Sequence, residues 1–183
     1  MEKRKAIVTG SSSGIGKAIT SILLKSGADV IGIARHHEKF EPDFDRYLPI
    51  SLDLSDFEKI ESVIPQLLLE HSDIDVLICN AGHGDFQALE NFSSKQISKF
   101  INLNLISHII LCRHLVSYMK AKGNGDIIVI GSEASLAGKK KATLYSAAKF
   151  GLRGFTQALR DECGNTGVRV CLINPGFVRS SFF

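Results

Sequence analysis

The chain has 183 residues, with 22 Lys or Arg against 19 Asp or Glu, and its formal charge of +3 is too small for a dedicated nucleic-acid binder. This length supports one hydrophobic core, so we expect a single domain over residues 1–183. No continuous apolar run is long enough to span a membrane, and the run after the charged start is too short for a secretory signal.

The cysteines and histidines show no metal-ligand spacing. The four cysteines are Cys79, Cys112, Cys163 and Cys171. None forms a C-x-x-C pair, and the six histidines are scattered, so we expect no metal site. Because the cysteines mostly lie in apolar runs, we expect them to be reduced core residues of a cytoplasmic protein.

Short β-branched runs alternate with longer stretches of helical period along the chain. The predicted strands are 6–9, 30–34, 47–52, 74–79, 126–130 and 168–173. This alternation predicts an α/β fold: a doubly wound parallel sheet of at least six strands with helices on both faces.

Helices are predicted between these strands. The first has an expected buried stripe of Ile15, Ile19 and Ile22. The second begins at a capping box of Ser55 and Glu58, and a long helix to about residue 120 begins at another box, Ser93 and Gln96. The last predicted helix covers 143–163.

A glycine-rich turn, TGSSSGIG at residues 9–16, joins the first strand to the first helix. Gly10 permits the tight turn, Gly14 lets the backbone approach a diphosphate, and Gly16 allows close packing of helix on strand. A P-loop needs glycine at Ser11 and Ser or Thr at Ala18, so ATP or GTP hydrolysis is disfavoured. The turn therefore predicts dinucleotide binding. The expected contacts are Gly10, Ser12, Ser13, Gly14, Ile15 and Gly16.

Arg35 follows the second strand, at the place where an enzyme that uses NAD typically carries an acid for the ribose 2′-hydroxyl. A guanidinium pairs instead with a 2′-phosphate through charge-assisted hydrogen bonds. Arg35 thus predicts NADP over NAD, and the alternative is a solvated surface arginine. His36 and His37 could assist Arg35, but we interpret them as exposed loop residues.

Tyr145 and Lys149 are four residues apart in the last helix and so share one face. The ammonium, helped by the positive charge of an oxidised nicotinamide, is expected to lower the pKa of the phenol from about 10 toward working pH. Ser132 ends the fifth strand, at the sheet edge where ligands bind. The alternatives are an ordinary amphipathic helix surface and a serine that satisfies local backbone.

Together these motifs resemble the short-chain dehydrogenase/reductase family over residues 9–180. The resemblance implies a Rossmann-like fold and an NADP(H)-dependent oxidoreductase that reduces a carbonyl to an alcohol, reversibly, with Tyr145 as general acid. Its implied catalytic residues are Asn104, Ser132, Tyr145 and Lys149. Asn104 would support a water-linked proton relay to the lysine, and Asn102 is its rival for that role.

The resemblance also implies further cofactor contacts. These are Asp53, Leu54, Asn80, Ala81, Gly82, Pro175, Gly176, Val178 and Ser180, together with Tyr145 and Lys149. Cys79 stands where the family commonly has a second asparagine, and Ser180 stands where threonine is usual.

Relative to the family, the sequence is C-terminally incomplete, because a substrate lid and seventh strand normally follow residue 183. Either a tail follows this sequence in the full protein or the protein is truncated. Substrate identity stays open among a ketone, a sugar, a steroid-like ring and a 3-oxoacyl thioester. Candidate pocket residues are His83, Gly84, Glu133, Ala134, Leu144 and Phe177.

Alternative functions are a nonenzymatic NADPH-binding sensor or scaffold, an inactive truncated family member, and a nucleotide-sugar epimerase. The expected partner is a small-molecule carbonyl or alcohol, with no nucleic acid and no membrane. The last helix carries a line of small residues: Ala147, Gly151, Gly154 and Ala158. Because many relatives associate through their fourth and fifth helices, this line suggests a homodimer or homotetramer. Burial against the chain's own sheet explains it equally well.

Overall fold

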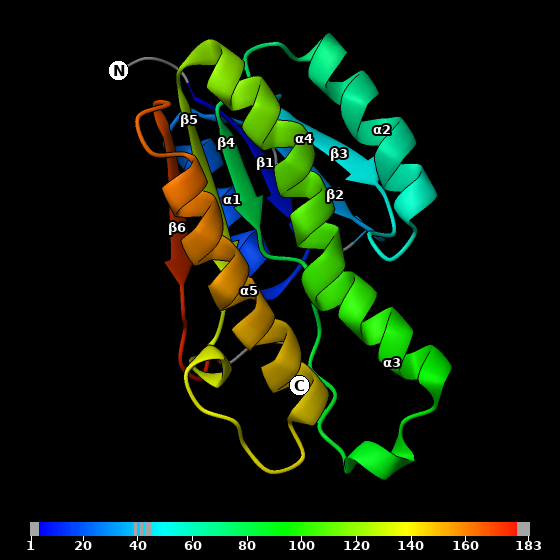
Figure 1. Ribbon diagram of the computed structural model, residues 1–183. Coiled ribbons are helices and arrows are strands. Elements are labelled where there is room, and N and C mark those ends of the chain that lie inside the picture. The colour runs from blue at the N-terminus through cyan, green and yellow to red at the C-terminus, as the bar shows by residue number, and fades with distance from the viewer. Residues whose placement is uncertain (1–3, 39, 41, 43–44, 179–183) are drawn as a thin grey trace.

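The computed structural model describes residues 4–38, 40, 42 and 45–178, which form a parallel sheet flanked by helices (Figure 1). The strands are β1 (Lys5–Thr9), β2 (Asp29–Ala34), β3 (Tyr47–Ser51), β4 (Val76–Cys79), β5 (Gly125–Ile130) and β6 (Val168–Ile173). Their order in the sheet is β3-β2-β1-β4-β5-β6. All six predicted strands are confirmed. The order reverses between β1 and β4, the kind of switch point at which open parallel sheets bind ligands.

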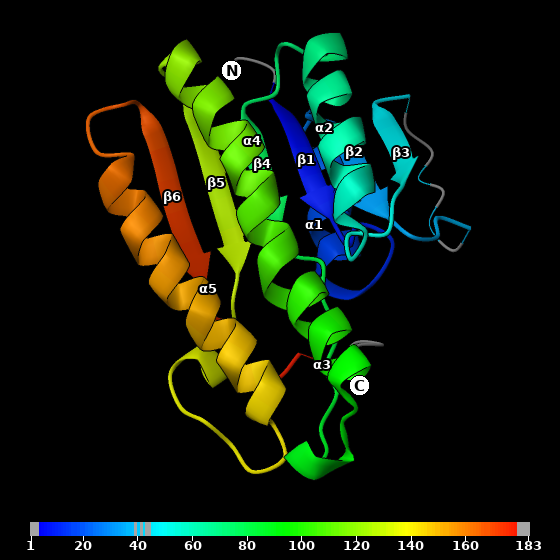
Figure 2. The ribbon, with the colours of Figure 1, turned by 45° about the vertical axis from the view of Figure 1, so that its right-hand side comes forward.

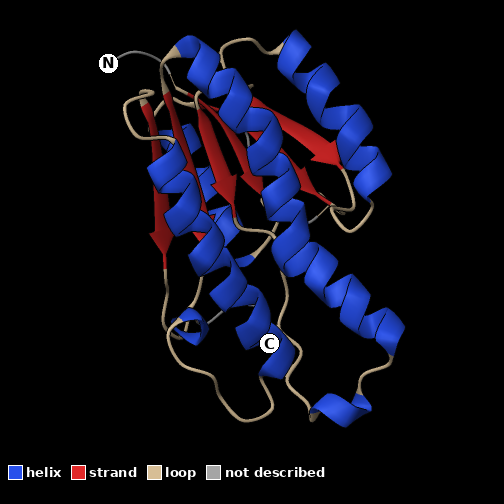
Figure 3. Cartoon of the chain, in the orientation of Figure 1, coloured by secondary structure: helices blue, strands red, loops and turns tan. Residues whose placement is uncertain are grey.

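Helices cover both faces of the sheet unequally (Figures 2 and 3). They are α1 (Gly14–Lys25), α2 (Phe57–Glu70), α3 (Ser94–Ile101), α4 (Ser107–Lys122) and α5 (Thr143–Glu162), with short turns η1 (Leu89–Asn91), η2 (Asn102–Ile106) and η3 (Glu133–Ser135). The larger core joins the sheet to Ile60 of α2, Leu111 of α4 and Leu152 of α5. On the other face, Leu24 of α1 packs with Val8 in a smaller core.

The edge strand β6 alternates between buried and exposed residues. Val168 and Val170 are buried in the larger core, whereas Arg169 and Cys171 are exposed. The expectation that all four cysteines lie in the core is therefore wrong for Cys171, because strand alternation turns it away from the helices. The other three cysteines are free and buried, as predicted.

Two helix details differ from the sequence predictions. The buried residues of α1 are Gly16, Thr20 and Leu24, while Ile22 is 64% exposed. The reason is that Gly16 packs against the Gly10 carbonyl, where an added Cβ would overlap it, and this contact fixes the rotation of α1. At α2 the cap is Asp56 rather than Ser55, because Ser55 instead donates to Asp53.

The long helix is continuous but not uniform. Its predicted capping box of Ser93 and Gln96 is confirmed, and α3 runs through the π-helical turn η2 into α4. By length and composition alone this helix, Ser94–Lys122, could cross a membrane, although no apolar run of that length was expected; no other described helix meets this test. Leu111, Leu115 and Met119 of α4 are fully buried in the larger core, as in the core helix of a globular protein.

Ion pairs join four strands at the amino edge of the sheet. Arg4, just before β1, pairs with Asp75 before β4 at 2.5 Å and with Asp126 of β5 at 2.7 Å. Arg169 of β6 also pairs with Asp126, at 2.6 Å. Burial raises the pKa of Asp126, but hydrogen bonds from Arg169 and Arg4 outweigh this effect and the net pKa is lowered.

Candidate active site

A cleft of about 460 Å³ opens at the carboxyl edge of the sheet. The loops after β4, β5 and β6 lie at this edge (Figure 2). It brings together predicted residues from distant segments: Gly10, Ser13, Gly14, Ile15, Arg35, Asn80, Ala81, Gly82, Ser132, Tyr145, Lys149, Pro175, Gly176 and Val178. A pocket of about 150 Å³ adds Ser12, Asp53 and Leu54 and also includes Arg35.

Two predicted residues do not line this space. Gly16 and Asn104 are buried behind it, and Ser180 lies outside the described residues. Of the candidate substrate-pocket residues, His83, Glu133, Ala134 and Phe177 line the cleft. Leu144 packs instead in a small apolar cluster, and Gly84 is not among the lining residues.

The glycine turn has the geometry of an anion site. Gly10 and Gly14 have φ values of 66° and 51°, which favour glycine. Ser13 caps α1 without a side-chain hydrogen bond, and the first turn of α1 holds no acidic residue. Backbone N–H groups and the positive end of the helix dipole therefore face the cleft, so these residues fit the diphosphate of a dinucleotide.

Hydrogen bonds hold the two strands on either side of the switch point together. The Thr9 hydroxyl accepts the backbone N–H groups of Asn80 at 2.8 Å and Ala81 at 2.9 Å. The Asn80 amide donates to the Thr9 carbonyl at 2.9 Å. Asn80 thus fixes the glycine turn against the loop after β4, which agrees with its predicted structural role beside the cofactor.

Arg35 supplies positive charge to both pockets. Burial opposes ionisation of Asp53, yet two hydrogen bonds from Ser55 and the charge of Arg35 lower the pKa of Asp53 overall. Burial, with a smaller contribution from Arg35, also lowers the pKa of His83. Arg35 itself is exposed, so its guanidinium is accessible to a ligand.

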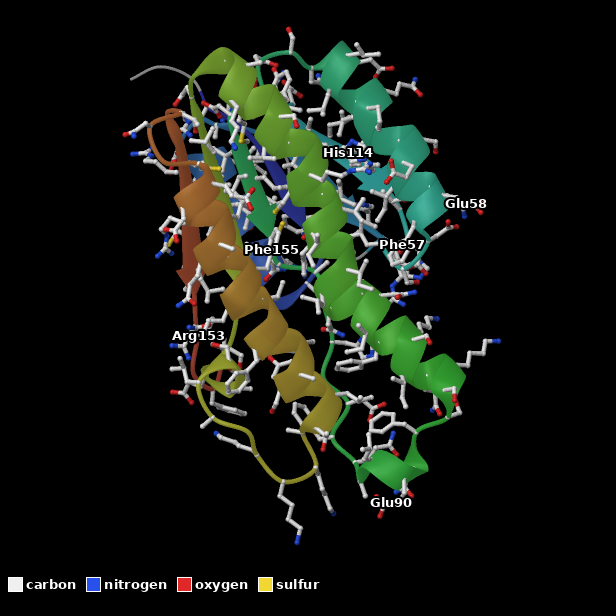
Figure 4. The ribbon with its side chains drawn as sticks, in the orientation of Figure 1. Phe57, Glu58, Glu90, His114, Arg153 and Phe155 are labelled. Atoms are coloured by element: carbon white, nitrogen blue, oxygen red, sulfur yellow. The ribbon has the colours of Figure 1, made fainter. Side chains whose placement is uncertain are left out.

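The loop that carries Ser132 is held by Asn174, a residue to which the sequence analysis gave no role. The Asn174 side-chain oxygen accepts the Ser132 N–H at 3.1 Å and the Ser135 hydroxyl at 2.9 Å. Arg153 of α5, labelled in Figure 4, donates to the Ser135 carbonyl at 3.4 Å. The asparagine stands directly before the proline-glycine turn, and this spacing was the signal that could have revealed it.

Ser132, Tyr145 and Lys149 meet in the cleft, but the electrostatics differ from the prediction. Burial raises the pKa of the Tyr145 phenol above its ordinary value, and a side-chain hydrogen bond with Ser132 lowers it by less. Lys149 is not a cause of the change: its ammonium donates to the Ile130 carbonyl at 2.9 Å and lies 5.7 Å from the centre of the Tyr145 ring. Among the groups of this chain, the expected lowering of the phenol pKa by the lysine is therefore not confirmed.

Lys149 is 4% exposed, and burial lowers its pKa from 10.5 to about 8. The charged side chain therefore costs stability below pH 8, and this cost is relieved as the pH rises from 8 toward 10.5. A pKa difference of this size corresponds to about 3 kcal/mol, against about 2 kcal/mol for the lost hydrogen bond from the charged ammonium to Ile130.

We therefore expect Lys149→Met to increase the free energy of unfolding at pH 7 by about 1 kcal/mol. The gain should shrink as the pH approaches 10. Denaturant unfolding of both proteins across this pH range measures the difference. Exposed Lys95→Met on α3 is the matched control and should show no such pH dependence. A gain independent of pH would contradict this account of the lysine.

Asn104 is fully buried and its side chain is committed to the backbone. It accepts the His83 N–H at 3.1 Å and donates to the Phe100 carbonyl at 3.0 Å, so it joins the π-helical turn to the loop after β4. One turn later, His108 is also fully buried. Burial, with the charge of Lys149 adding to it, lowers the pKa of His108 to about 3, so this residue is a neutral neighbour of the lysine that the sequence analysis missed.

Residues 4–183 match the short chain dehydrogenase family, and the fold and the convergence of Ser132, Tyr145 and Lys149 agree with this match. The chain belongs to this family. Among curated relatives, the 3-oxoacyl-[acyl-carrier-protein] reductase FabG of Buchnera aphidicola is 33% identical to this chain over 187 residues. That alignment covers all of the chain and 76% of the relative.

Solved structures of family members bind either nicotinamide cofactor. A metagenomic short-chain oxidoreductase in complex with NADP has a TM-score of 0.89 at 33% identity, covering 96% of this chain and 83% of that chain. A 4-hydroxyisoleucine dehydrogenase complexed with NADH has a TM-score of 0.91 at 28% identity, covering 98% of this chain and 78% of that chain. This chain thus shares its fold with a protein that binds NADP and with one that binds NADH.

Proposed function

We propose that this chain is an NADPH-dependent reductase that converts a small-molecule carbonyl to an alcohol, reversibly. The observation that carries the proposal is the shared cleft: Ser132, Tyr145 and Lys149 line the same space as the glycine turn. A nonenzymatic nucleotide sensor would need the glycine turn and Arg35 but not this convergence of three catalytic side chains.

The preference for NADPH over NADH rests on Arg35. It is the first residue after β2 and lines both pockets beside the glycine turn. A guanidinium there recognises a ribose phosphate through paired, charge-assisted hydrogen bonds. Asp53 and Leu54 close the adjoining pocket, where they would contact the adenine, and Ser180 is proposed to contact the nicotinamide end.

The chemistry needs a hydride and a proton. A bound nicotinamide nucleotide supplies the hydride to the carbonyl carbon. The Ser132 hydroxyl donates a hydrogen bond to the carbonyl oxygen, and the Tyr145 phenol transfers its proton to that oxygen as the C–O bond becomes single. The raised pKa keeps Tyr145 protonated near neutral pH, the form that a reduction requires. A proton would return to Tyr145 from solvent by way of the Lys149 ammonium, and Asn104 is proposed to support the water-linked relay to that lysine.

The residues of the cleft define the type of reaction more narrowly than the class of substrate. Phe86 lies 5.4 Å from the Tyr145 ring, and Phe177 and Glu133 also line the cleft, so the space beside the phenol has apolar walls and one carboxylate. The relationship to FabG supports a 3-oxoacyl thioester as the first substrate to test. Ketones, sugars and steroid-like rings complete the panel.

The test is NADPH oxidation by the purified protein, followed by absorbance, across this panel of carbonyl compounds. We expect carbonyl-dependent turnover that is faster with NADPH than with NADH. Binding of NADPH without turnover on any carbonyl would favour a sensor. More efficient use of NADH would contradict the assignment of Arg35.

We also propose that the protein acts in the cytoplasm as a homodimer or homotetramer, without nucleic acid or a membrane. Support for association comes from α5. Ala147, Gly154 and Ala158 are exposed, and an added Cβ at Gly154 would meet nothing within 4 Å. Only Gly151 of this line packs within the chain, against Leu105. Burial against its own sheet therefore does not explain the line, and a monomer by light scattering would rule out association through it.

A further inference from the structure

Tyr47, in the edge strand β3, connects two loops that flank the cofactor pocket. Its phenol oxygen lies 3.2 Å from the Ser11 hydroxyl, inside the glycine turn. The same oxygen lies 3.1 Å from Nδ1 of His37, two residues beyond Arg35. One hydroxyl group therefore contacts both loops.

The donor and acceptor of each hydrogen bond in this series can be assigned by starting from the bond between His37 and Ile50. Nε2 of His37 lies 3.1 Å from the Ile50 carbonyl, which can only accept, so Nε2 carries the hydrogen. In the neutral ring Nδ1 then accepts, and Tyr47 must donate to it. The phenol oxygen is left to accept the hydrogen of Ser11. Every group is satisfied, and the direction runs from Ser11 through Tyr47 and His37 to Ile50.

Gly32 in the middle of β2 makes room for the contact. A Cβ at this position would lie 2.6 Å from the Ser11 hydroxyl oxygen and would overlap the Tyr47 ring. Glycine weakens a strand interior, so its presence needs a local reason, such as close approach of another group. Here the reason is that only glycine lets the Tyr47 ring cross β2 and reach the turn.

Both linked loops contribute residues to the smaller pocket. Ser12 and Ser13 follow Ser11 in one loop, and Arg35 and His36 precede His37 in the other. The backbone already joins the two segments at the end of β2, because the Gly10 N–H donates to the Ile33 carbonyl at 2.8 Å. The Tyr47 hydroxyl adds a side-chain link beyond the end of this strand, and so contributes to the separation of the two loops.

We propose that Tyr47 is a positioning residue that sets the separation of the glycine turn and the Arg35 loop, and so tunes affinity for a dinucleotide with a phosphate on its ribose. This inference rests on the proposed use of NADPH. A nucleotide that engages both the turn and Arg35 depends on the separation, and NADH, without the extra phosphate, depends on it less.

The test compares dissociation constants for NADPH and NADH, measured by fluorescence titration in the absence of substrate. Tyr47→Phe keeps the ring and removes only the hydroxyl. We expect it to weaken NADPH binding about fivefold and NADH binding by less than about twofold. Ser11→Ala should give a similar change, and the double variant should be no weaker than either single variant, because both remove the same connection.

Tyr118→Phe is the matched control. This tyrosine of α4 donates to the Ser72 carbonyl, outside the cleft, so the substitution loses one phenol hydrogen bond without touching the pocket. Neither dissociation constant should change. Thermal unfolding of each variant shows whether it is folded, and if Tyr47→Phe does not fold, Ser11→Ala decides the question.

The outcomes separate this inference from the proposed function. If the unsubstituted protein does not bind NADPH, both are overturned. If it binds NADPH but the ratio of the two dissociation constants is unchanged in Tyr47→Phe and Ser11→Ala, only the positioning role is overturned. Additive losses in the double variant would also overturn it.

Discussion

Tyr145→Phe should lower the rate of carbonyl reduction by roughly 10²–10⁴-fold, the usual contribution of general acid catalysis. The substitution removes the phenol proton and leaves the ring. That ring packs with Phe86 and with the buried cluster around Leu144 and Ala148, so the fold of the cleft should be retained. Steady-state turnover with the best carbonyl of the panel measures the loss.

The same variant should bind NADPH within about twofold of the unsubstituted protein, since one neutral hydrogen bond contributes little to net affinity. Fluorescence titration provides this control, and Tyr118→Phe should leave turnover unchanged. If Tyr145→Phe turned over at the normal rate, another group would have to supply the proton and the mechanism proposed for this cleft would fail.

Arg35→Asp should reverse the choice of cofactor. Loss of a charge-assisted contact to the ribose phosphate, and its replacement with a repulsive carboxylate, should weaken NADPH binding by roughly 10–100-fold. NADH should bind more tightly than before, because the new carboxylate can accept hydrogen bonds from the ribose hydroxyls. Dissociation constants for both nucleotides measure the reversal.

Arg35→Lys is the companion variant. It keeps the charge but loses the planar, two-pronged geometry, so an intermediate loss of NADPH affinity is expected. High salt should weaken NADPH binding with either side chain, since both carry their charge at an exposed position. If Arg35→Asp left the ratio of the two affinities unchanged, the guanidinium would not be the discriminating group.

Much of the fold could be predicted because its strands are short, apolar and separated by helical periods. The carboxyl ends of β1, β4 and β5 carry the glycine turn, Asn80 and Ser132, and parallel topology alone brings such ends together. That is why residues scattered over the sequence could be assigned to one cleft before their positions were known.

Other features could not be predicted, because they depend on contacts that the periodicity of the sequence does not reveal. The rotation of α1 follows from the contact of Gly16 with Gly10, and the exposure of Ile22 is its result. The pKa of Tyr145 depends on how deeply the ring is buried, which helical spacing cannot supply. The link from Tyr47 to Ser11 crosses β2 diagonally, and from the sequence Gly32 could equally have marked a bulge.

Arg4 pairs with Asp75 and Asp126, and Arg169 pairs with Asp126. These ion pairs link the strands at the edge of the sheet opposite the cleft. Neither arginine lines the cleft or its adjoining pocket. Residues in the loops at the carboxyl edge can therefore be substituted while the ion pairs still hold the strands together at the amino edge. In such an arrangement the substrate specificity of a protein can change through its loops while the sheet that supports them is kept.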